Sequence, residues 1–401
     1  MDPIKILPQE VSEIIWLKLP LSDIQSCLLV STLWYNSISN CSTFWRNLCN
    51  TKIIKYNSWK LTYLEEMKIK WAWRNCEFSQ VIIDLETDLK LICCYEDFIY
   101  IINTKNILIK YNRFGELITT KSMEVNLKEI SVIADKLILL YETNQQNEIL
   151  LLNEKFVEIC KFKTIDQKLN NANGKFWFWT ENNSNLVTIY TLESGKIDEL
   201  EAIYGSDLIP FESNSWVSHY NGEVHLLFEN NIKKKIYAIN SSPMTMPKLE
   251  ILTNNKDIIV VVEKKIIEER HKFSSIHIFE NEKKSMSHYL EFYIEQARIS
   301  GDLLILTTSN SIQLYNLNTF NVSTTTTRYE TIENIYNLFV MKNLNWIIIK
   351  YDDKLTLFDL INLEDLTIIN DNTIENLFLY TIKFFITKIN YKRLVIKTIM
   401  I

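Results

Sequence analysis

The sequence has little glycine and histidine, and it lacks the motifs of common catalytic sites. Six glycines and five histidines occur among 401 residues. None of the glycines belongs to a G-x-G-x-x-G, P-loop or G-x-S-x-G motif, and no H-E-x-x-H pair is present. His219 and His225 flank Gly222 without a cysteine that would complete a metal site. We therefore expect neither an enzyme nor a bound metal or cofactor.

Long apolar runs and paired cysteines are lacking as well. No run reaches the roughly 18 apolar residues that a membrane helix needs, and the N-terminus has no signal-peptide apolar region. The seven cysteines are odd in number and form no C-x-x-C pair, which disfavours a disulfide framework. We expect free thiols, and hence a cytoplasmic or nuclear protein. The net charge of −6 gives no overall attraction to nucleic acid.

What the sequence does have is a helical pattern in its first 50 residues. Pro8 suits the first turn of a helix, and Pro20 ends that helix. Apolar residues recur three and four positions apart in each of three expected helices: Val11, Ile14 and Ile15; Ile24, Cys27 and Leu28; Trp34 and Ile38. Three helices of this size bury too little surface to be stable alone, so we expect a leftover apolar surface to dock on a partner.

This block resembles the F-box, the small helical module that binds the Skp-family adaptor of cullin–RING ubiquitin ligases. The family pattern matches Leu7, Pro8, Glu10, Ile15, Leu19, Asp23, Val30, Ser31, Trp34 and Trp45. The resemblance implies that residues 1–50 form a three-helix F-box and that all of these residues except Ser31 bind the adaptor.

Residues 51–78 are expected to form a helical linker. Tyr63, Met67 and Trp71 recur on one helical face beside Leu64, and Ser58 is a suitable N-cap. Trp59, Trp71 and Trp73 are candidate packing residues. In F-box proteins with a large C-terminal domain, such a linker fixes the orientation of the two modules.

From residue 79 to residue 401 a strand signature recurs, an aliphatic–any–aliphatic run that often ends in an aromatic residue and Asn, Asp or Glu. It occurs as LIKYN from Leu108, ILLLN from Ile149, VTIYT from Val187, IYAIN from Ile236, IHIFE from Ile276, IQLYN from Ile312, LTLFD from Leu355 and LVIKT from Leu394. The mean interval of about 41 residues is typical of β-propeller blades.

We interpret the signature as the third strand of each four-stranded blade, and the repeat resembles a diverged WD-like propeller. This interpretation predicts eight blades. Seven is the alternative, if the long stretch between Val187 and Ile236 has been divided into too many repeat units. Residues 79–86 read as an unpaired strand, which is expected to complete the last blade and close the ring. With so few glycines, the turns are expected to use Asn, Asp, Lys and Ser.

Basic residues in two expected loops suggest where a partner binds. Lys233, Lys234 and Lys235 precede IYAIN, and Arg270 and Lys272 precede IHIFE. We place both groups in loops between second and third strands, which open on one face of a propeller, with Arg298 on an inner strand near the same mouth. These six residues are candidate substrate-binding residues for an acidic or phosphorylated protein. The alternative is that these basic residues are solvated loop charges without a binding role.

Together, an F-box and a propeller indicate a substrate receptor of an SCF-type ubiquitin ligase. Its partners would be the Skp-family adaptor, the cullin–RING core and a protein substrate, without nucleic acid or a membrane span. The alternative is an adaptor-bound scaffold with a structural or trafficking role. The sequence does not separate the two, because both need the same modules.

Overall fold

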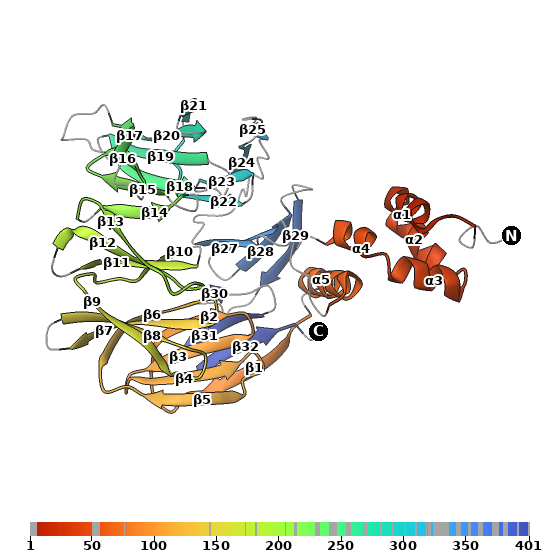
Figure 1. Ribbon diagram of the computed structural model, residues 1–401, viewed down its shortest axis with the longest axis horizontal. Coiled ribbons are helices and arrows are strands. Elements are labelled where there is room, and N and C mark those ends of the chain that lie inside the picture. The colour runs from red at the N-terminus through yellow and green to blue at the C-terminus, as the bar shows by residue number, and fades with distance from the viewer. Residues whose placement is uncertain are drawn as a thin grey trace. The chain divides into compact units, whose positions relative to one another are not determined.

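The computed structural model describes residues 6–399 except 50–56, 76, 144–145, 173, 181–182, 205, 212–214, 229–232, 240–246, 254–257, 268–270, 281–282, 291, 301, 309–310, 318, 320–321, 324–336, 342–345, 352–353, 360–363, 371–376, 380–383 and 391–392. The chain divides into two compact units (Figure 1). The helical unit is Met1–Ser79 with Asn343–Trp346 and Ile399–Ile401, and the β unit is Gln80–Lys342 with Ile347–Thr398.

The helical unit contains α1 (Gln9–Lys18), α2 (Leu21–Leu28), α3 (Thr32–Ser39), α4 (Ser42–Leu48) and α5 (Trp59–Arg74). Pro8 and Pro20 occupy the N-cap positions of α1 and α2. The hydroxyl of Ser31 accepts the Trp34 N–H at the start of α3, and that of Ser58 accepts the Leu61 N–H at the start of α5. The first 50 residues thus form four short helices where three were predicted, because the Trp45 segment is a helix of its own.

Aromatic side chains dominate the core of the helical unit. Trp16, Ile24, Ile38 and Trp45 are buried together, and the rings of Trp45 and Tyr63 lie 5.6 Å apart. The indole N–H of Trp45 donates to the Ile38 carbonyl at 2.8 Å, so this buried polar group is satisfied. Trp45 therefore fastens α4 both to α3 and to α5.

The packing predicted for the linker helix is confirmed only in part, because Trp73 is buried and Trp59 half-buried whereas Trp71 is exposed. Leu64, Met67 and Trp71 are exposed, Trp71 to 56 %, and of the predicted face only Tyr63 is buried. The buried side of α5 consists of Thr62, Tyr63, Glu65, Glu66, Ile69, Ala72 and Trp73. Apolar spacing did not identify this side because it includes two carboxylates.

In the described residues the β unit contains eight four-stranded sheets. Seven consist of consecutive strands: β2–β5 (Leu89–Tyr95, Phe98–Asn103, Ile107–Asn112, Leu117–Ser122), β6–β9 (Asn126–Ile133, Lys136–Thr143, Gln146–Leu152, Glu158–Thr164), β10–β13 (Asn170–Ala172, Lys175–Thr180, Asn183–Thr191, Ile197–Glu201), β14–β17 (Asp207–Pro210, Ser215–Tyr220, Glu223–Phe228, Lys233–Ala238), β18–β21 (Lys248–Thr253, Ile258–Ile267, His271–Glu280, Lys283–Leu290), β22–β25 (Gln296–Ser300, Leu303–Thr307, Ile312–Asn316, Val322–Ser323) and β26–β29 (Asn337–Met341, Trp346–Tyr351, Lys354–Asp359, Glu364–Asn370). The eighth joins β30 (Leu377–Leu379), β31 (Phe384–Asn390) and β32 (Arg393–Thr398) to β1 (Ser79–Asp84).

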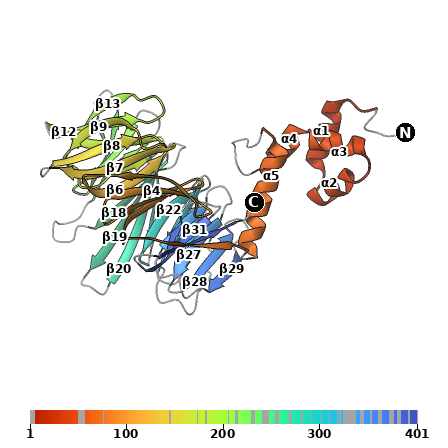
Figure 2. The ribbon, with the colours of Figure 1, turned by 90° about the horizontal axis from the view of Figure 1, so that it is seen from below.

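Neighbouring sheets pack on one another through aliphatic side chains. Second and third strands such as β7 and β8 are apolar on both faces because a sheet covers each face, and buried clusters join successive sheets from the β1-containing sheet to β22–β25. First strands contact one another, β14 with β18 and β18 with β22. The first strands therefore lie nearest the centre around which the sheets follow one another, as Figure 1 and the turned view of Figure 2 show.

The two ends of the β unit share one sheet, as predicted. β1 lies beside β32 in the order β1-β32-β31-β30, and the Arg393 Nε donates to Asp84 Oδ1 at 2.6 Å. Ile396 of β32 packs in one cluster with Ile83 near the start of the β unit and with Ile99 of β3. Residues more than 300 positions apart in the sequence thus complete a sheet together.

Asparagines shape the turns that follow the signature strands. The Oδ1 atom of Asn112 accepts the Glu116 N–H at 3.0 Å, and that of Asn153 accepts the Val157 N–H at 2.9 Å. Asn316 accepts the Thr319 N–H at 3.1 Å in the same manner. The asparagine side chains accept hydrogen bonds from the following backbone, which confirms the expected use of asparagine, and the Asn112 turn also contains Gly115 at a φ of +79°.

The signature is the third strand of its sheet in seven of its eight occurrences. The exception is IYAIN, which lies in the fourth strand β17, whereas Glu223–Phe228 forms the third strand of that sheet. Ile236 and Tyr237 of β17 pack against the next sheet, and this packing gives an outer strand the apolar pattern of a third strand.

The packing of Ile396 predicts how strongly its truncation lowers the stability of the protein. Ile396 is fully buried where the β1-containing sheet meets β2–β5, so Ile396→Ala should lower the free energy of unfolding by about 2–5 kcal/mol. Ile82→Ala, on the exposed side of β1, should cost less than about 1 kcal/mol. Denaturant unfolding of both variants measures the difference. Equal losses would contradict the closure through β32.

Candidate functional site

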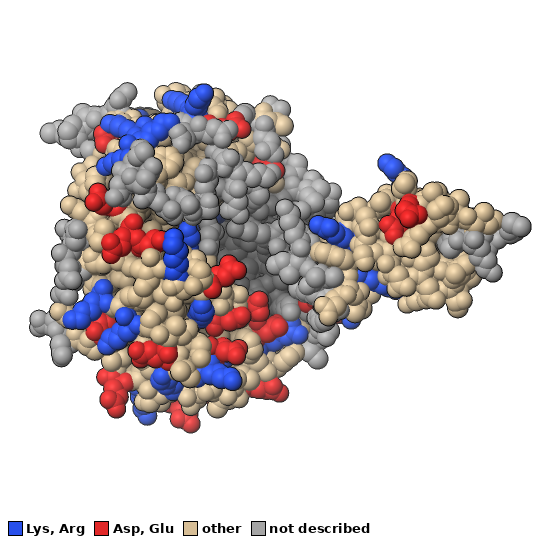
Figure 3. Space-filling view, in the orientation of Figure 1, with Lys and Arg blue, Asp and Glu red and all other residues tan. Residues whose placement is uncertain are grey.

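The helical unit exposes many large apolar side chains. Between residues 6 and 33 these are Ile6, Val11, Ile14, Ile15, Leu17, Leu29, Val30 and Leu33. Leu29 is 87 % exposed, Val30 61 % and Ile14 59 %. Figure 3 shows few charged atoms over this unit in its view. So much exposed apolar surface on a small module is typical of a protein-docking site.

Helix α1 directs its apolar stripe to solvent. Val11, Ile14 and Ile15 share one face of the helix, whereas Ser12 and Trp16 face the core. Trp16 alone anchors α1, with its ring 5.3 Å from that of Trp34. The apolar stripe predicted from the sequence is present on α1, but its side chains do not pack into the core of the helical unit.

The predicted adaptor-binding residues fall into two groups. Pro8, Glu10, Ile15, Asp23 and Val30 are exposed and able to contact a partner. Leu7, Leu19 and Trp34 are half-buried, and Trp45 is only 4 % exposed. Trp45 therefore supports the fold of the unit and does not offer a contact surface.

Sequence reasoning did not assign Ile14, Leu17, Leu29 or Leu33 to the docking surface. Leu29 and Val30 form the turn between α2 and α3 and have no core to enter. The sequence signal for Leu29 was the run Leu28-Leu29-Val30, because three consecutive apolar side chains cannot all lie on one buried face of a helix.

The predicted placement of the basic residues is wrong for β17. Lys233, Lys234 and Lys235 are exposed at the start of this fourth strand and pair with β16, so they do not lie in a loop between second and third strands. Lys272 begins the third strand β20, at the opposite end of its sheet, and Arg270 lies outside the described residues. Lys233, Lys234 and Lys235 therefore lie at the opposite end of their sheet from the end at which Lys272 lies in its own, and the role of these residues in substrate binding stays a prediction.

Lys233, Lys234 and Lys235 instead contribute to a basic area on the outer strands β17 and β21. Lys283 and Lys284 are exposed at the start of β21, the outermost strand of the next sheet. Blue atoms gather in Figure 3 where Figure 1 places β17 and β21, while red and blue alternate over the lower part of the face. Lys235 is paired with Glu223, which reduces the net charge of this area.

Arg298 lies on the inner strand β22, as predicted, but it is paired. Its guanidinium is 3.2 Å from Glu250 of the neighbouring inner strand β18. The ammonium of Lys264 is 2.7 Å from the same carboxylate. Glu250 thus pairs with Arg298, but because Lys264 faces the same carboxylate this group of three keeps one net positive charge.

One pocket in the described part of the β unit lies along the inner strands. Its volume is about 350 Å³, and three successive first strands line it: Asn170 from β10, Asp207, Leu208 and Ile209 from β14, and Leu249, Glu250 and Ile251 from β18. Trp177 and Trp179 of β11, Ser206 and His219 complete the lining. We call it the inner pocket. Its lining combines two carboxylates with two indoles.

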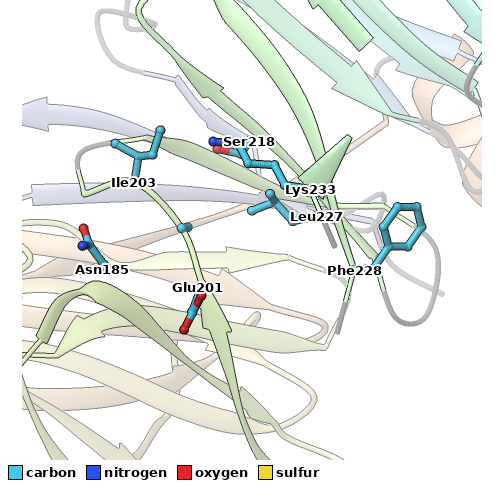
Figure 4. Close-up of a pocket in the computed structure, with 8 residues that line it drawn as sticks. Asn185, Glu201, Ile203, Ser218, Leu227, Phe228 and Lys233 are labelled. Carbon is cyan, nitrogen blue, oxygen red and sulfur yellow. The ribbon is translucent and has the colours of Figure 1, made fainter. Parts of the chain in front are cut away.

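A smaller pocket lies between the outer strands of sheets β10–β13 and β14–β17. Its volume is about 270 Å³, and Glu201 and Lys233 bring opposite charges to it (Figure 4). Ile203, Leu227 and Phe228 supply apolar walls. Lys233 is the predicted substrate-binding residue that lines this pocket.

A buried polar network between β17 and sheet β18–β21 has its hydrogen bonds satisfied. Glu263 accepts from Ser275 at 2.8 Å and from Tyr237 at 3.1 Å, and its other oxygen is 2.9 Å from Lys265. Burial raises the pKa of Glu263, but the bonds from His277, Lys265 and Ser275 outweigh it and lower this pKa to about 2. His277 also contacts Ser287. This network holds two sheets together.

The described residues contain no group of three or more His, Cys, Asp and Glu side chains that would hold a metal ion. Among the described helices, none is both long and apolar enough to cross a membrane. The described cysteines carry free thiols, and burial raises the pKa of those at Cys93 and Cys94.

Comparisons with known proteins identify the fold of the β unit. The chain is similar to the computationally designed protein Ika8 (TM-score 0.54, 9% identity, 80% of this chain and 100% of that one). It is also similar to BamB from Moraxella catarrhalis (TM-score 0.50, 10% identity, 80% and 99%) and to a eukaryotic initiation factor (TM-score 0.51, 12% identity, 78% and 90%). No protein-family model and no curated protein matches the sequence. The β unit is a β-propeller.

Asp166, beside the inner pocket, predicts a pH dependence of stability. Burial raises its pKa from 3.8 to about 6, although its Oδ2 accepts the Trp179 N–H at 2.9 Å. Between these two pH values the folded state holds a proton that the unfolded state releases, so this group makes stability fall as the pH rises through that window. Asp166→Asn keeps an acceptor for Trp179 and should remove this fall, adding about 1–3 kcal/mol at neutral pH. Denaturant unfolding at pH 4 and pH 7 checks it, and a variant with the parental pH profile would contradict it.

Proposed function

We propose that this chain is the substrate-recognition subunit of an SCF-type cullin–RING ubiquitin ligase. The observation that carries the proposal is the exposed apolar surface of the helical unit, which coincides with a sequence that resembles the F-box. Ile15 and Val30, both predicted adaptor-binding residues, belong to this surface. Burial of such side chains on the Skp-family adaptor would supply the affinity.

The propeller is the part that captures the substrate. We propose that its eight four-stranded sheets close into one ring of eight blades, which presents inner-strand surfaces to a protein partner. The chain itself needs no catalytic residue, because holding a substrate beside the RING-bound ubiquitin donor raises the effective concentration of the reacting groups. We therefore propose that the chain is a non-catalytic receptor. We also propose that it works in the cytoplasm or nucleus.

An adaptor-bound scaffold without a role in degradation is the second candidate. It needs the same helical surface and the same propeller, so adaptor binding does not separate the two. The presence of the cullin does. A degradation receptor must form one complex with adaptor, cullin and substrate, whereas a scaffold binds the adaptor alone.

Adaptor binding should depend on the exposed apolar side chains. The double substitution Ile14→Asp with Val30→Asp should lower the affinity for the purified Skp-family adaptor about thirtyfold, on the order of 2 kcal/mol. The melting temperature should stay unchanged because neither side chain is in the core. Titration of the adaptor, followed by calorimetry, measures the affinity.

A matched control uses two exposed apolar residues of the propeller. Leu117 and Ile118 of β5 are as exposed as the residues tested, so Leu117→Asp with Ile118→Asp introduces the same charges elsewhere. This control should bind the adaptor normally. Normal binding by the Ile14/Val30 variant as well would rule out the proposed docking surface.

The substrate-receptor role is tested in cells. Partners captured by the full chain should include the adaptor and the cullin, and the propeller-bound partner should accumulate when the chain is removed. The Ile14/Val30 variant should retain that partner and lose both ligase subunits. A partner whose level and ubiquitination do not depend on the chain would favour the scaffold.

A further inference from the structure

The inner pocket has one carboxylate, that of Asp207, for which the described residues provide no lysine or arginine partner. Glu250 already faces two cations, Lys264 and Arg298. The carboxylate of Asp207 faces only the His219 ring, at 3.6 Å, and its side chain is 85 % exposed. No lysine or arginine is among the described residues that line this pocket. An added cation would therefore find a carboxylate that the described residues leave largely uncompensated.

Ser206 supplies an independent sign that the inner pocket takes a ligand. It is 7 % exposed, it lines the pocket, and its Oγ has no hydrogen-bond partner among the described residues. A buried hydroxyl without a partner costs stability, so such groups are uncommon unless something else bonds them. A ligand N–H that enters the pocket would give this hydroxyl a donor.

The aromatic residues of the pocket suit a cation too. Trp177 and Trp179 are almost fully buried and line the same pocket as Asp207. An indole face attracts an ammonium or guanidinium, and the guanidinium also stacks on it. A pocket of about 350 Å³ accommodates one long side chain. An acidic or phosphorylated side chain would instead be placed beside the carboxylate of Asp207.

We propose that the inner pocket binds an arginine or lysine side chain of the protein that the propeller captures. Asp207 pairs with the cation, Ser206 accepts one of its N–H groups, and the two indoles flank its aliphatic stem. The role of the pocket as a partner site rests on the proposed function. The chemistry of the bound side chain is new, since the sequence had suggested an acidic or phosphorylated partner.

Fluorescein-labelled nine-residue peptides test the proposal with the full-length chain. They share one Gly/Ser/Ala sequence and differ at the central position, which is arginine, lysine, norleucine or phosphoserine. Fluorescence anisotropy should show the arginine or the lysine peptide binding at least about tenfold more tightly than the norleucine and phosphoserine peptides. Binding of that peptide should weaken as salt rises, because charge pairing contributes to it.

Three variants locate the binding. Asp207→Asn should weaken the basic peptide about fivefold, and Ser206→Ala about threefold without lowering the melting temperature, since the hydroxyl has no partner to lose among the described residues. Glu201→Gln, which removes an exposed carboxylate from the smaller pocket, should bind like the parent.

Equal affinity for the basic and norleucine peptides, tighter binding of the phosphoserine peptide, or parental binding by Asp207→Asn would overturn the proposal. Adaptor titration of the same preparations keeps the two proposals apart. A chain that binds the adaptor but shows no preference for basic peptides refutes only the cation site. A chain that selects basic peptides but does not bind the adaptor refutes only the ligase role.

Discussion

Burial of both sheet faces is the constraint on which the described part of the β unit depends. Second and third strands such as Lys136–Thr143 and Gln146–Leu152 are apolar on both sides, and neither side is stable in water. A sheet of this kind needs a neighbour on each face, and buried clusters join successive sheets from the β1-containing sheet to β22–β25. The strand Ser79–Asp84 completes the last sheet and leaves the first residues of the β unit next to its final strand. The inner pocket exists because this packing brings three first strands together.

In the helical unit, by contrast, many apolar side chains are left exposed. Its core is small and mostly aromatic, and Trp16, Trp45 and Tyr63 leave no room for the aliphatic side chains of α1. Ile14, Leu29 and Val30 consequently remain exposed. This surplus of apolar surface is a cost for an isolated module and a source of binding energy once a partner covers it. The proposed ligase role takes its physical basis from this surplus.

Local patterns predicted the repeat well because each unit repeats the same chemistry. The terminal asparagines of LIKYN and ILLLN bond the next turn, which explains why they belong to the signature. IYAIN was misplaced because an outer strand that packs on the next sheet resembles a third strand, and the error moved Lys233 to the wrong end of its sheet. The α5 face was missed because buried Glu65 and Glu66 do not look like core residues. The inner pocket was invisible in the sequence, since Asn170, Asp207 and Glu250 come from three separate sheets and meet only through packing.

The most direct test of the proposed function is amide hydrogen exchange of the full chain with and without the purified Skp-family adaptor. Docking through the exposed apolar surface predicts that the adaptor slows exchange in peptides from residues 6–39, which contain Ile14, Leu29 and Val30. Peptides from the propeller should exchange at unchanged rates. Absence of a complex, or protection confined to the propeller, would contradict the assignment of the helical unit as the adaptor-binding module.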